Sequence, residues 1–218
     1  MITLKDLYNE VTGQPWSMFD GDIEKQDEFE STVILSIQKA LGNLWNVYNF
    51  PFKLKDYKVT TKKGKAFYPT PVGNIARSGA DYGIRIGKDP LDYLSDYLTM
   101  PDKEGKPEYF YLKNDKLYLY PTPDDVYAVN MEYYALYPAV DAETDEDKYT
   151  LVNENDYINI PERYEQIFKN ALLPLTMVYA IASNSDENHS GYQRQYEDAL
   201  QILIDFSQGV DKYKYKGW

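Results

Sequence analysis

Cysteine is absent from the 218-residue chain, and histidine occurs once, as His189. Without cysteine the chain can form no disulfide, no thiolate nucleophile and no cysteine-ligated metal site. A transition-metal site would depend almost entirely on carboxylates, because a lone histidine between Asn188 and Ser190 is typical of a loop or capping residue. The phosphate-binding, dinucleotide-binding, zinc-protease and serine-hydrolase motifs are also missing. We therefore expect no enzyme activity, no cofactor and no bound metal.

Basic residues and long apolar runs are scarce as well. The chain has 23 Lys and Arg against 35 Asp and Glu, a formal charge of −12 that repels the phosphates of nucleic acids. The longest apolar run, ALLPLTMVYAIA at 171–182, is twelve residues, too short to span a bilayer. The first residues lack the basic and apolar segments of a secretory signal. These features predict a soluble protein made in the cytoplasm, with no membrane partner and no specific binding to DNA.

An acidic stretch, DAETDED at 141–147, is a candidate calcium loop. Position six counted from Asp141 is Glu146 instead of glycine, and position twelve is Val152 instead of glutamate. A solvated linker fits this stretch better than a calcium site.

Tyrosine is abundant, with 23 Tyr against 8 Phe, and six of the tyrosines fall between residues 116 and 138. A tyrosine ring favours burial while its hydroxyl needs a partner or water, so tyrosine is enriched at protein interfaces. The composition therefore indicates a surface that another protein covers. A base-composition bias of the source genome is an alternative explanation.

Helical periodicity occurs at both ends of the chain, at 3–12, 23–48, 161–183 and 190–208. Thr3 and Asp6 have the spacing of a capping box, and glycines follow two of the helices, at Gly13 and Gly209. The sequence predicts an α+β fold, in which residues 1–50 and 158–210 form an antiparallel helical bundle. Residues 51–157 form an inserted antiparallel β domain, and residues 211–218 form a tail.

The clearest strand pattern predicts a three-strand meander from 109–113, 117–120 and 126–134. In the last strand Val129 and Met131 lie on one face, and Asn130, Glu132 and Tyr134 lie on the other, half-polar face. A sheet with apolar residues on both faces is usually covered on both. Residues 69–83 are expected to form an irregular loop, and Pro90 is expected to begin a short helix that reaches Leu98.

The tail alternates lysine with aromatic residues and ends in Tyr213, Tyr215 and Trp218. A frayed terminus is one interpretation. The other is an arm that becomes ordered on docking, with aromatic side chains on one side and charges on the other.

Several short motifs, in order, resemble one family. Residues 119–123 read LYPTP, a strand ends in YYALYP at 133–138, the acidic loop follows, and IxIPERY occupies 158–164. The closing helix has YxxAL at 196–200, and ITLKDL opens the chain at 2–7. Together they resemble the head–tail connector proteins of tailed phages, the adaptor called tail tubular protein A in short-tailed phages. The Tyr-, Asn- and Lys-rich composition is similar to that of crAss-like phages, and residues 60–107 have no clear counterpart in the family.

The resemblance implies a structural virion protein that forms a homo-oligomeric ring, twelvefold, between the portal protein and the next tail or nozzle ring protein. DNA would pass through its channel without specific binding. The interface residues that we expect on this basis are Tyr118, Tyr127, Tyr134, Tyr213, Tyr215 and Trp218. A glycan-binding module of a phage tail or surface protein, with tyrosines stacked on sugar rings, is the alternative.

Overall fold

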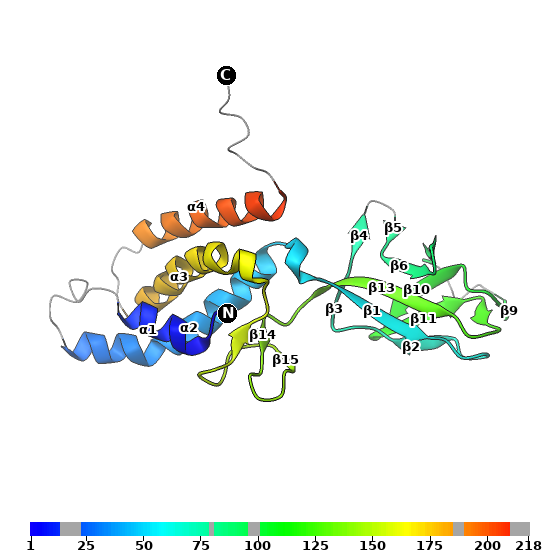
Figure 1. The fold of residues 1–218 in the computed structure, drawn as a ribbon, viewed down its shortest axis with the longest axis horizontal. Helices are drawn as coiled ribbons and strands as arrows, with labels where there is room; N and C mark the ends of the chain where they lie inside the picture. Colours follow the sequence, from blue (N-terminus) through cyan, green and yellow to red (C-terminus); the bar gives the residue numbers. More distant parts are fainter. Residues whose placement is uncertain (14–22, 79–80, 96–100, 185–189, 210–218) are drawn as a thin grey trace, which may run out of the picture. The chain divides into compact units, whose positions relative to one another are not determined.

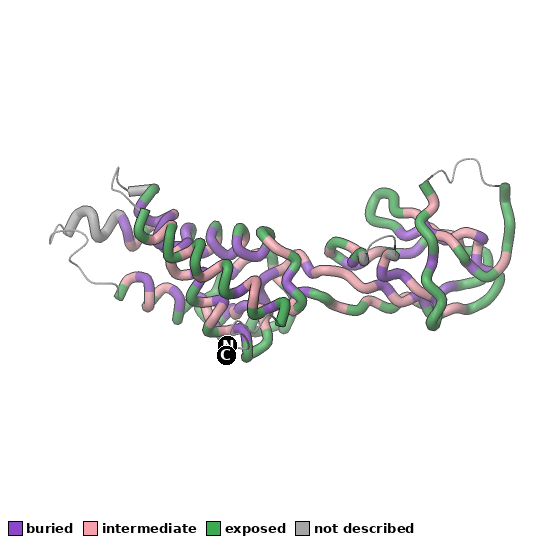
Figure 2. Tube along the Cα trace, turned by 90° about the horizontal axis from the view of Figure 1, so that it is seen from above, coloured by how far each residue is buried: buried purple, intermediate pink, exposed green. Residues whose placement is uncertain are grey.

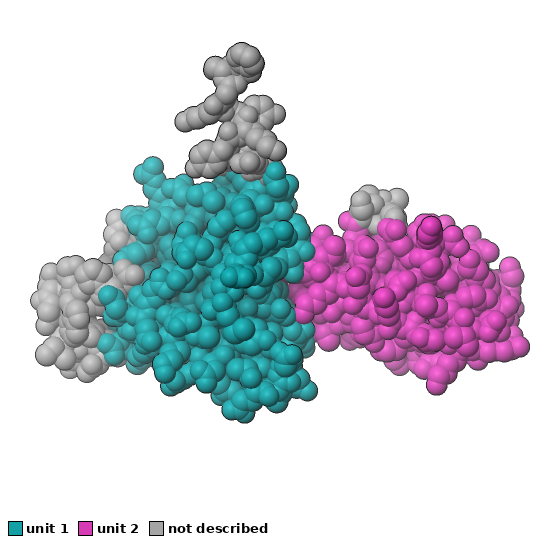
Figure 3. Space-filling model, viewed as in Figure 1, with its two compact units in different colours: residues 1–52, 136–218 teal, residues 53–135 magenta. Residues whose placement is uncertain are grey.

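The computed structural model describes residues 1–13, 23–78, 81–95, 101–184 and 190–209. The chain forms two compact units, which Figure 3 shows in different colours: residues 1–52 with 136–218, and residues 53–135. We call them the helical unit and the β unit. The sequence places the end of the β insertion near residue 157, whereas residues 136–157 belong to the helical unit in the structure.

The described residues of the helical unit form four α-helices, labelled in Figure 1. Their bounds are α1 (Leu4–Thr12), α2 (Ile23–Val47), α3 (Glu162–Asn184) and α4 (Ser190–Ser207), each within one residue of the predicted range. The capping box at α1 is present, because the Thr3 hydroxyl accepts the Asp6 N–H at 3.1 Å and the Asp6 carboxylate accepts the Thr3 N–H at 3.3 Å. The sequence therefore predicts the helices of this unit well.

The helices bury a continuous apolar core. Helix α3 packs against α2 and α4, and α1 packs against α2 and α3. The bulkiest fully buried side chains of this core are Leu7, Ile37, Leu41, Leu44, Trp45, Phe50, Leu151 and Phe168. Aromatic rings meet where the short 3-10 helix Pro51–Lys53 follows α2, with Phe50 stacked on Phe52 at 5.0 Å.

A small sheet completes the helical unit. Its central strand β14 (Ala139–Val140) pairs with β15 (Asp147–Lys148) and β16 (Tyr157–Ile158). The segment before α1 binds the same region, since Ile158 N–H donates to the Ile2 carbonyl and Leu4 N–H to the Asp156 carbonyl, both at 3.0 Å. These bonds join the first residues of the chain to the strand that precedes α3.

The first sheet of the β unit is built around β13 (Ala128–Ala135). Strand β1 (Leu54–Thr60) pairs with one edge of β13 over seven residues, while β6 (Ile84–Ile86) and β3 (Gly73–Ile75) pair with the other. Strand β7 (Asp89–Pro90) pairs with β6. The predicted helix after Pro90 is therefore wrong: Pro90 lies in an edge strand, where its missing N–H is tolerated, and β8 (Asp92–Tyr93) follows it.

The second sheet of the β unit has the order β2-β11-β10-β8. The hairpin of β10 (Tyr109–Lys113) and β11 (Lys116–Tyr120) turns at Asn114 and Asp115, whose φ angles of 51° and 55° suit a tight hairpin turn. Strand β2 (Phe67–Pro69) pairs with the free edge of β11. The predicted meander is wrong for this reason, because β10 and β2 occupy both edges of β11 and β13 joins the other sheet.

Short strand pairs accompany the two sheets. Strand β9 (Glu104–Gly105) pairs with β12 (Thr122–Pro123), and β4 (Arg77–Ser78) pairs with β5 (Asp81–Tyr82). The latter two, with β3, lie where the sequence predicts an irregular loop, so that prediction is wrong in part.

The two sheets of the β unit share one core. It contains Val129 and Met131 from β13, Ile84 and Ile86 from β6, and Tyr68, Phe110, Leu117 and Leu119 from the second sheet. Buried residues alternate with less buried ones along β11 and β6, so each sheet has an inner face and an outer face. Figure 2 colours the described chain by burial. The α+β fold class is confirmed. Of the described helices, none is long and apolar enough to cross a membrane.

Candidate interaction surface

The outer face of the hairpin sheet carries a row of aromatic side chains. Because Phe110, Leu117 and Leu119 point into the core, their neighbours in sequence point outward. The register places Tyr109 opposite Tyr120, Tyr111 opposite Tyr118, and Tyr118 opposite Phe67 of β2. We call these five residues, Phe67, Tyr109, Tyr111, Tyr118 and Tyr120, the aromatic face.

The rings of the aromatic face are in contact with one another. Tyr111 and Tyr118 stack with centroids 4.5 Å apart and an interplanar angle of 12°, and Phe67 lies 5.7 Å from Tyr118. Cross-strand aromatic pairs of this kind contribute on the order of 0.2–1 kcal/mol each to a sheet. The tyrosines are half-buried, and Phe67 is 43% exposed. An exposed phenylalanine within an aromatic cluster is typical of a surface that another molecule covers.

Two lysines flank Phe67. The Lys116 ammonium lies 4.9 Å from the centroid of the Phe67 ring, and the Lys65 ammonium lies 5.6 Å from it. Within the described parts of the chain, no carboxylate forms an ion pair with either lysine. The aromatic face therefore combines exposed apolar surface with two positive charges that have no carboxylate partner among the described residues, an arrangement that attracts an acidic partner.

A small hollow of about 130 Å³ opens beside Tyr118. It is lined by Ala66, Pro101, Asp102, Lys103, Tyr111, Tyr118, Leu119, Tyr120 and Thr122. Ligand pockets usually measure about 300–1,000 Å³. The hollow has room for one side chain of a partner and is too small for a cofactor.

The predicted interface tyrosines do not lie together. Tyr118 belongs to the aromatic face, whereas Tyr134 lies on β13 of the other sheet, opposite Leu54 and Asn74. Tyr127 packs against the core of the β unit, and its hydroxyl donates to Asp124 at 2.7 Å. This hydrogen bond to an acceptor carboxylate raises the pKa of Tyr127. Tyr213, Tyr215 and Trp218 lie outside the described residues.

Sequence reasoning missed Phe67, Tyr111 and the two lysines. The alternation in YFYLK at 109–113 and KLYLY at 116–120, around a two-residue turn, is the signal that places Tyr111 beside Tyr118. Phe67 joins them through the pairing of β2 with β11, which places Phe67 opposite Tyr118. The two residues lie 51 positions apart in the sequence, so no local pattern reveals that they are neighbours.

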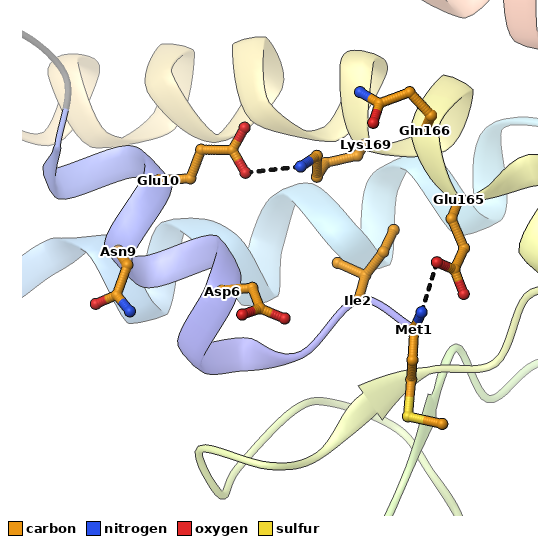
Figure 4. A pocket seen from close by; sticks show the side chains of 8 residues that line it. All are labelled: Met1, Ile2, Asp6, Asn9, Glu10, Glu165, Gln166 and Lys169. Carbon is orange, nitrogen blue, oxygen red and sulfur yellow. Dashed lines mark hydrogen bonds and ion pairs between the residues drawn. The ribbon is translucent and has the colours of Figure 1, made fainter.

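A larger hollow, of about 460 Å³, lies between α1 and α3 in the helical unit. Figure 4 shows the side chains that line it, among them Asp6, Glu10, Glu165 and Lys169. Its charged groups are already paired: Lys169 donates to Glu10 at 2.9 Å, the amino group of Met1 to Glu165, and Asp6 accepts from Thr3. A ligand would have to displace these partners, so the aromatic face is the better candidate.

The sequence profile of SU10 adaptor proteins matches residues 20–215. The chain belongs to the SU10 adaptor protein family. No curated protein matches it. Membership indicates a structural, non-enzymatic role in a phage particle, as an adaptor that assembles with portal and tail components, and so confirms the resemblance to phage adaptor proteins.

The acidic loop of this adaptor is neutralised at its base by one lysine. Lys148 forms ion pairs with Asp141 and with the fully buried Asp156. Hydrogen bonds from Lys148 and from the N–H groups of Glu143 and Thr144 lower the pKa of Asp141 to about 2. Burial opposes ionisation of Asp156, but hydrogen bonds from the N–H groups of Asn153 and Val152 and from Lys148 outweigh it, and its pKa is lowered.

The other carboxylates of the loop bind neutral groups or face solvent. Asp145 accepts the Tyr157 hydroxyl and Asp147 accepts the Asn159 amide, both at 2.9 Å, and neither partner is cationic. Glu143 and Glu146 are exposed and have no ion-pair partner within the described parts of the chain. Among the same residues, no group of three histidine or carboxylate side chains is placed to hold a metal.

The two units differ in net charge. The β unit, 53–135, has 13 basic and 12 acidic residues, a formal charge of +1. The helical unit has the other 10 basic and 23 acidic residues, a formal charge of −13. The acidity of the adaptor therefore belongs entirely to the helical unit.

Proposed function

We propose that this adaptor forms a homo-oligomeric ring between the portal and the next tail or nozzle ring of its phage. The observation that carries the proposal is the aromatic face, in which Phe67 and the stacked pair Tyr111 and Tyr118 lie on the outside of a folded unit. A contact with a neighbouring subunit would cover these rings. The resemblance to tail tubular protein A supports a twelvefold ring, and the Tyr-, Asn- and Lys-rich composition supports a crAss-like phage as the source.

The charge of the chain supports a channel role. A net charge of −12 disfavours binding to DNA phosphates, so DNA would pass through the ring without being held. We propose further that Tyr127 and Tyr134 contact neighbouring subunits or rings. Residues 211–218, with Tyr213, Tyr215 and Trp218, would act as an arm that contacts the portal or an adjacent subunit.

The geometry of the aromatic face favours a protein partner over a glycan. A sugar ring stacks on an open aromatic face, but Tyr111 and Tyr118 stack on each other and thereby close one face of each ring. The adjoining hollow of about 130 Å³ is also small for a saccharide.

Electron microscopy of the full chain mixed with the portal protein of its phage tests the proposal. We expect a ring of adaptor subunits on the portal, with twelve copies counted by symmetry. A chain that stays monomeric and leaves the portal bare would contradict the proposed function. Glycan binding by that stable monomer would support the alternative.

A further inference from the structure

We propose that the aromatic face of one subunit binds the acidic loop, residues 141–147, of a second copy of this chain. The inference rests on the ring proposed above and names the surfaces that hold the ring together. It starts from the difference in charge between the two units.

Charge determines which surfaces of two copies can approach each other. Two helical units, each at −13, repel, whereas the β unit at +1 meets a helical unit without that repulsion. A contact between different surfaces of identical chains is heterologous, and such contacts close into a ring when the rotation between subunits permits. The charge distribution therefore favours the kind of interface that a ring requires.

The charged side chains of the two surfaces are also complementary. On the β unit, Lys65 and Lys116 flank the exposed ring of Phe67 and have no carboxylate partner within the described residues. On the helical unit, Glu143 and Glu146 are exposed, and Lys148, which follows the loop, is already engaged by Asp141 and Asp156. Docking the loop on the aromatic face would pair these lysines with glutamates and cover Phe67. The remaining aromatic surface would be shielded from water at the same time.

Charge reversal on the full-length chain tests this contact. The variant Lys65→Glu with Lys116→Glu should weaken self-association about tenfold or more, because two attractive contacts become repulsive. The reciprocal variant Glu143→Lys with Glu146→Lys should weaken it similarly. Combining all four substitutions should restore association towards that of the unchanged chain. Sedimentation velocity and native mass measurements of the free chain, and particle images on the portal, give the readout.

A matched control separates the contact from a general effect of charge. Lys58 and Lys88 are exposed and lie away from the aromatic face, on β1 and in the turn between β6 and β7. The variant Lys58→Glu with Lys88→Glu changes the net charge equally and should associate like the unchanged chain. Thermal melting of each variant verifies that it is folded, and the substitutions in the exposed loop provide a second route if the lysine variant does not fold.

The outcomes distinguish this inference from the proposed function. If the unchanged chain forms rings but either charge-reversed pair associates normally, or if the fourfold variant stays dissociated, the inference is wrong while the ring stands. If the unchanged chain forms no ring alone or on the portal, both the proposed function and the inference fail. Loss in each pair, with restoration in the combination, supports the inference.

Discussion

The two units of the adaptor use aromatic residues in opposite ways. In the helical unit the largest buried rings form the core, since Trp45, Phe50 and Phe168 are at most 1% exposed, and its exposed rings among the described residues, Tyr149 and Phe206, do not form a row on one sheet face. Among the described residues of the β unit the ring of Phe110 is fully buried, while the aromatic face, from Phe67 to Tyr120, lies on the outside. Helices can turn one broad stripe towards a shared core, but each strand of a two-sheet unit presents every second residue outward. The abundance of tyrosine thus reflects two roles: tyrosines on an outer sheet face present a large part of the ring to a partner, whereas Tyr127 packs partly against the core and can offer only its remaining exposed part.

Truncation of a buried ring should have the largest effect on stability, and it tests whether these rings are packed in the cores of the two units. Phe168→Ala in the helical unit and Phe110→Ala in the β unit each leave a cavity in a core where the native ring is fully buried. We expect each to lower the free energy of unfolding by about 3–5 kcal/mol. Urea unfolding followed by circular dichroism measures the effect. A loss below about 1 kcal/mol in either variant would show that the ring is not packed in a core.

Substitution on the aromatic face should weaken association between subunits more than it destabilises the folded monomer. In the variant Tyr111→Ser with Tyr118→Ser, the stacked pair is lost from the outer face, so folding should suffer far less than in Phe110→Ala. Association should weaken by about 2–4 kcal/mol, the range for an aromatic anchor at an interface. Melting of the monomer and sedimentation of the assembled form separate the two effects. A variant that unfolds yet associates normally at low temperature would identify the pair as core residues.

Tyr127 allows core and surface tyrosines of the β unit to be compared directly, because its ring packs against the core. Tyr127→Ser should therefore reduce the stability of the monomer more than Tyr118→Ser does. Equal stability of the two variants would remove the distinction between core and surface tyrosines in this unit.

Smaller effects are expected at the polar base of the acidic loop in the helical unit. Asp156→Ala removes the acceptor of two backbone N–H groups and of Lys148. Because hydrogen bonds to a charged group contribute about 1.5–3 kcal/mol, we expect a loss of stability of that order. Chemical unfolding at pH 7 measures it, and Glu154→Ala on the exposed neighbouring position is the control, with an effect under about 0.5 kcal/mol.

The same carboxylates make stability depend on pH. The pKa of Asp141 is about 2 in the folded protein and that of Asp156 is also lowered, whereas an unfolded aspartate titrates near 3.9. Between these values the unfolded state binds more protons, so the free energy of unfolding falls as the pH is lowered from about 4 to about 2. Above pH 4 this contribution is fully present. The variant Asp156→Ala should show a shallower decline across the same range.

Much of the helical unit could be predicted from the sequence, because its signals are local. Thr3 and Asp6 mark the start of α1, and the apolar stripe through Val33, Ile37 and Leu44 defines the buried side of α2. The β unit depends on pairing between distant residues: β1 meets β13 across more than 60 positions, which no periodicity reveals. The meander prediction failed there, although its first two strands, 109–113 and 117–120, do pair as a hairpin.

The candidate surface could be predicted from the sequence only in part, where it depends on local alternation. Tyr118 was expected at an interface and lies on the aromatic face, because strand alternation places it outward. Its partner Phe67 becomes a neighbour only through the pairing of β2 with β11. Lys65 and Lys116 could not be identified from the sequence either, because their ammonium groups come close to the same Phe67 ring only in the folded unit.

Solvent labelling of the aromatic face tests the central claim most directly. Hydroxyl-radical labelling of the free chain and of the chain in the phage particle reports the exposure of Phe67, Tyr111 and Tyr118 in each state. Phe110, which is fully buried, is the internal reference and should remain unlabelled in both. We predict that the three rings are labelled in the free chain and protected in the particle. Equal labelling of all three in both states would contradict the account.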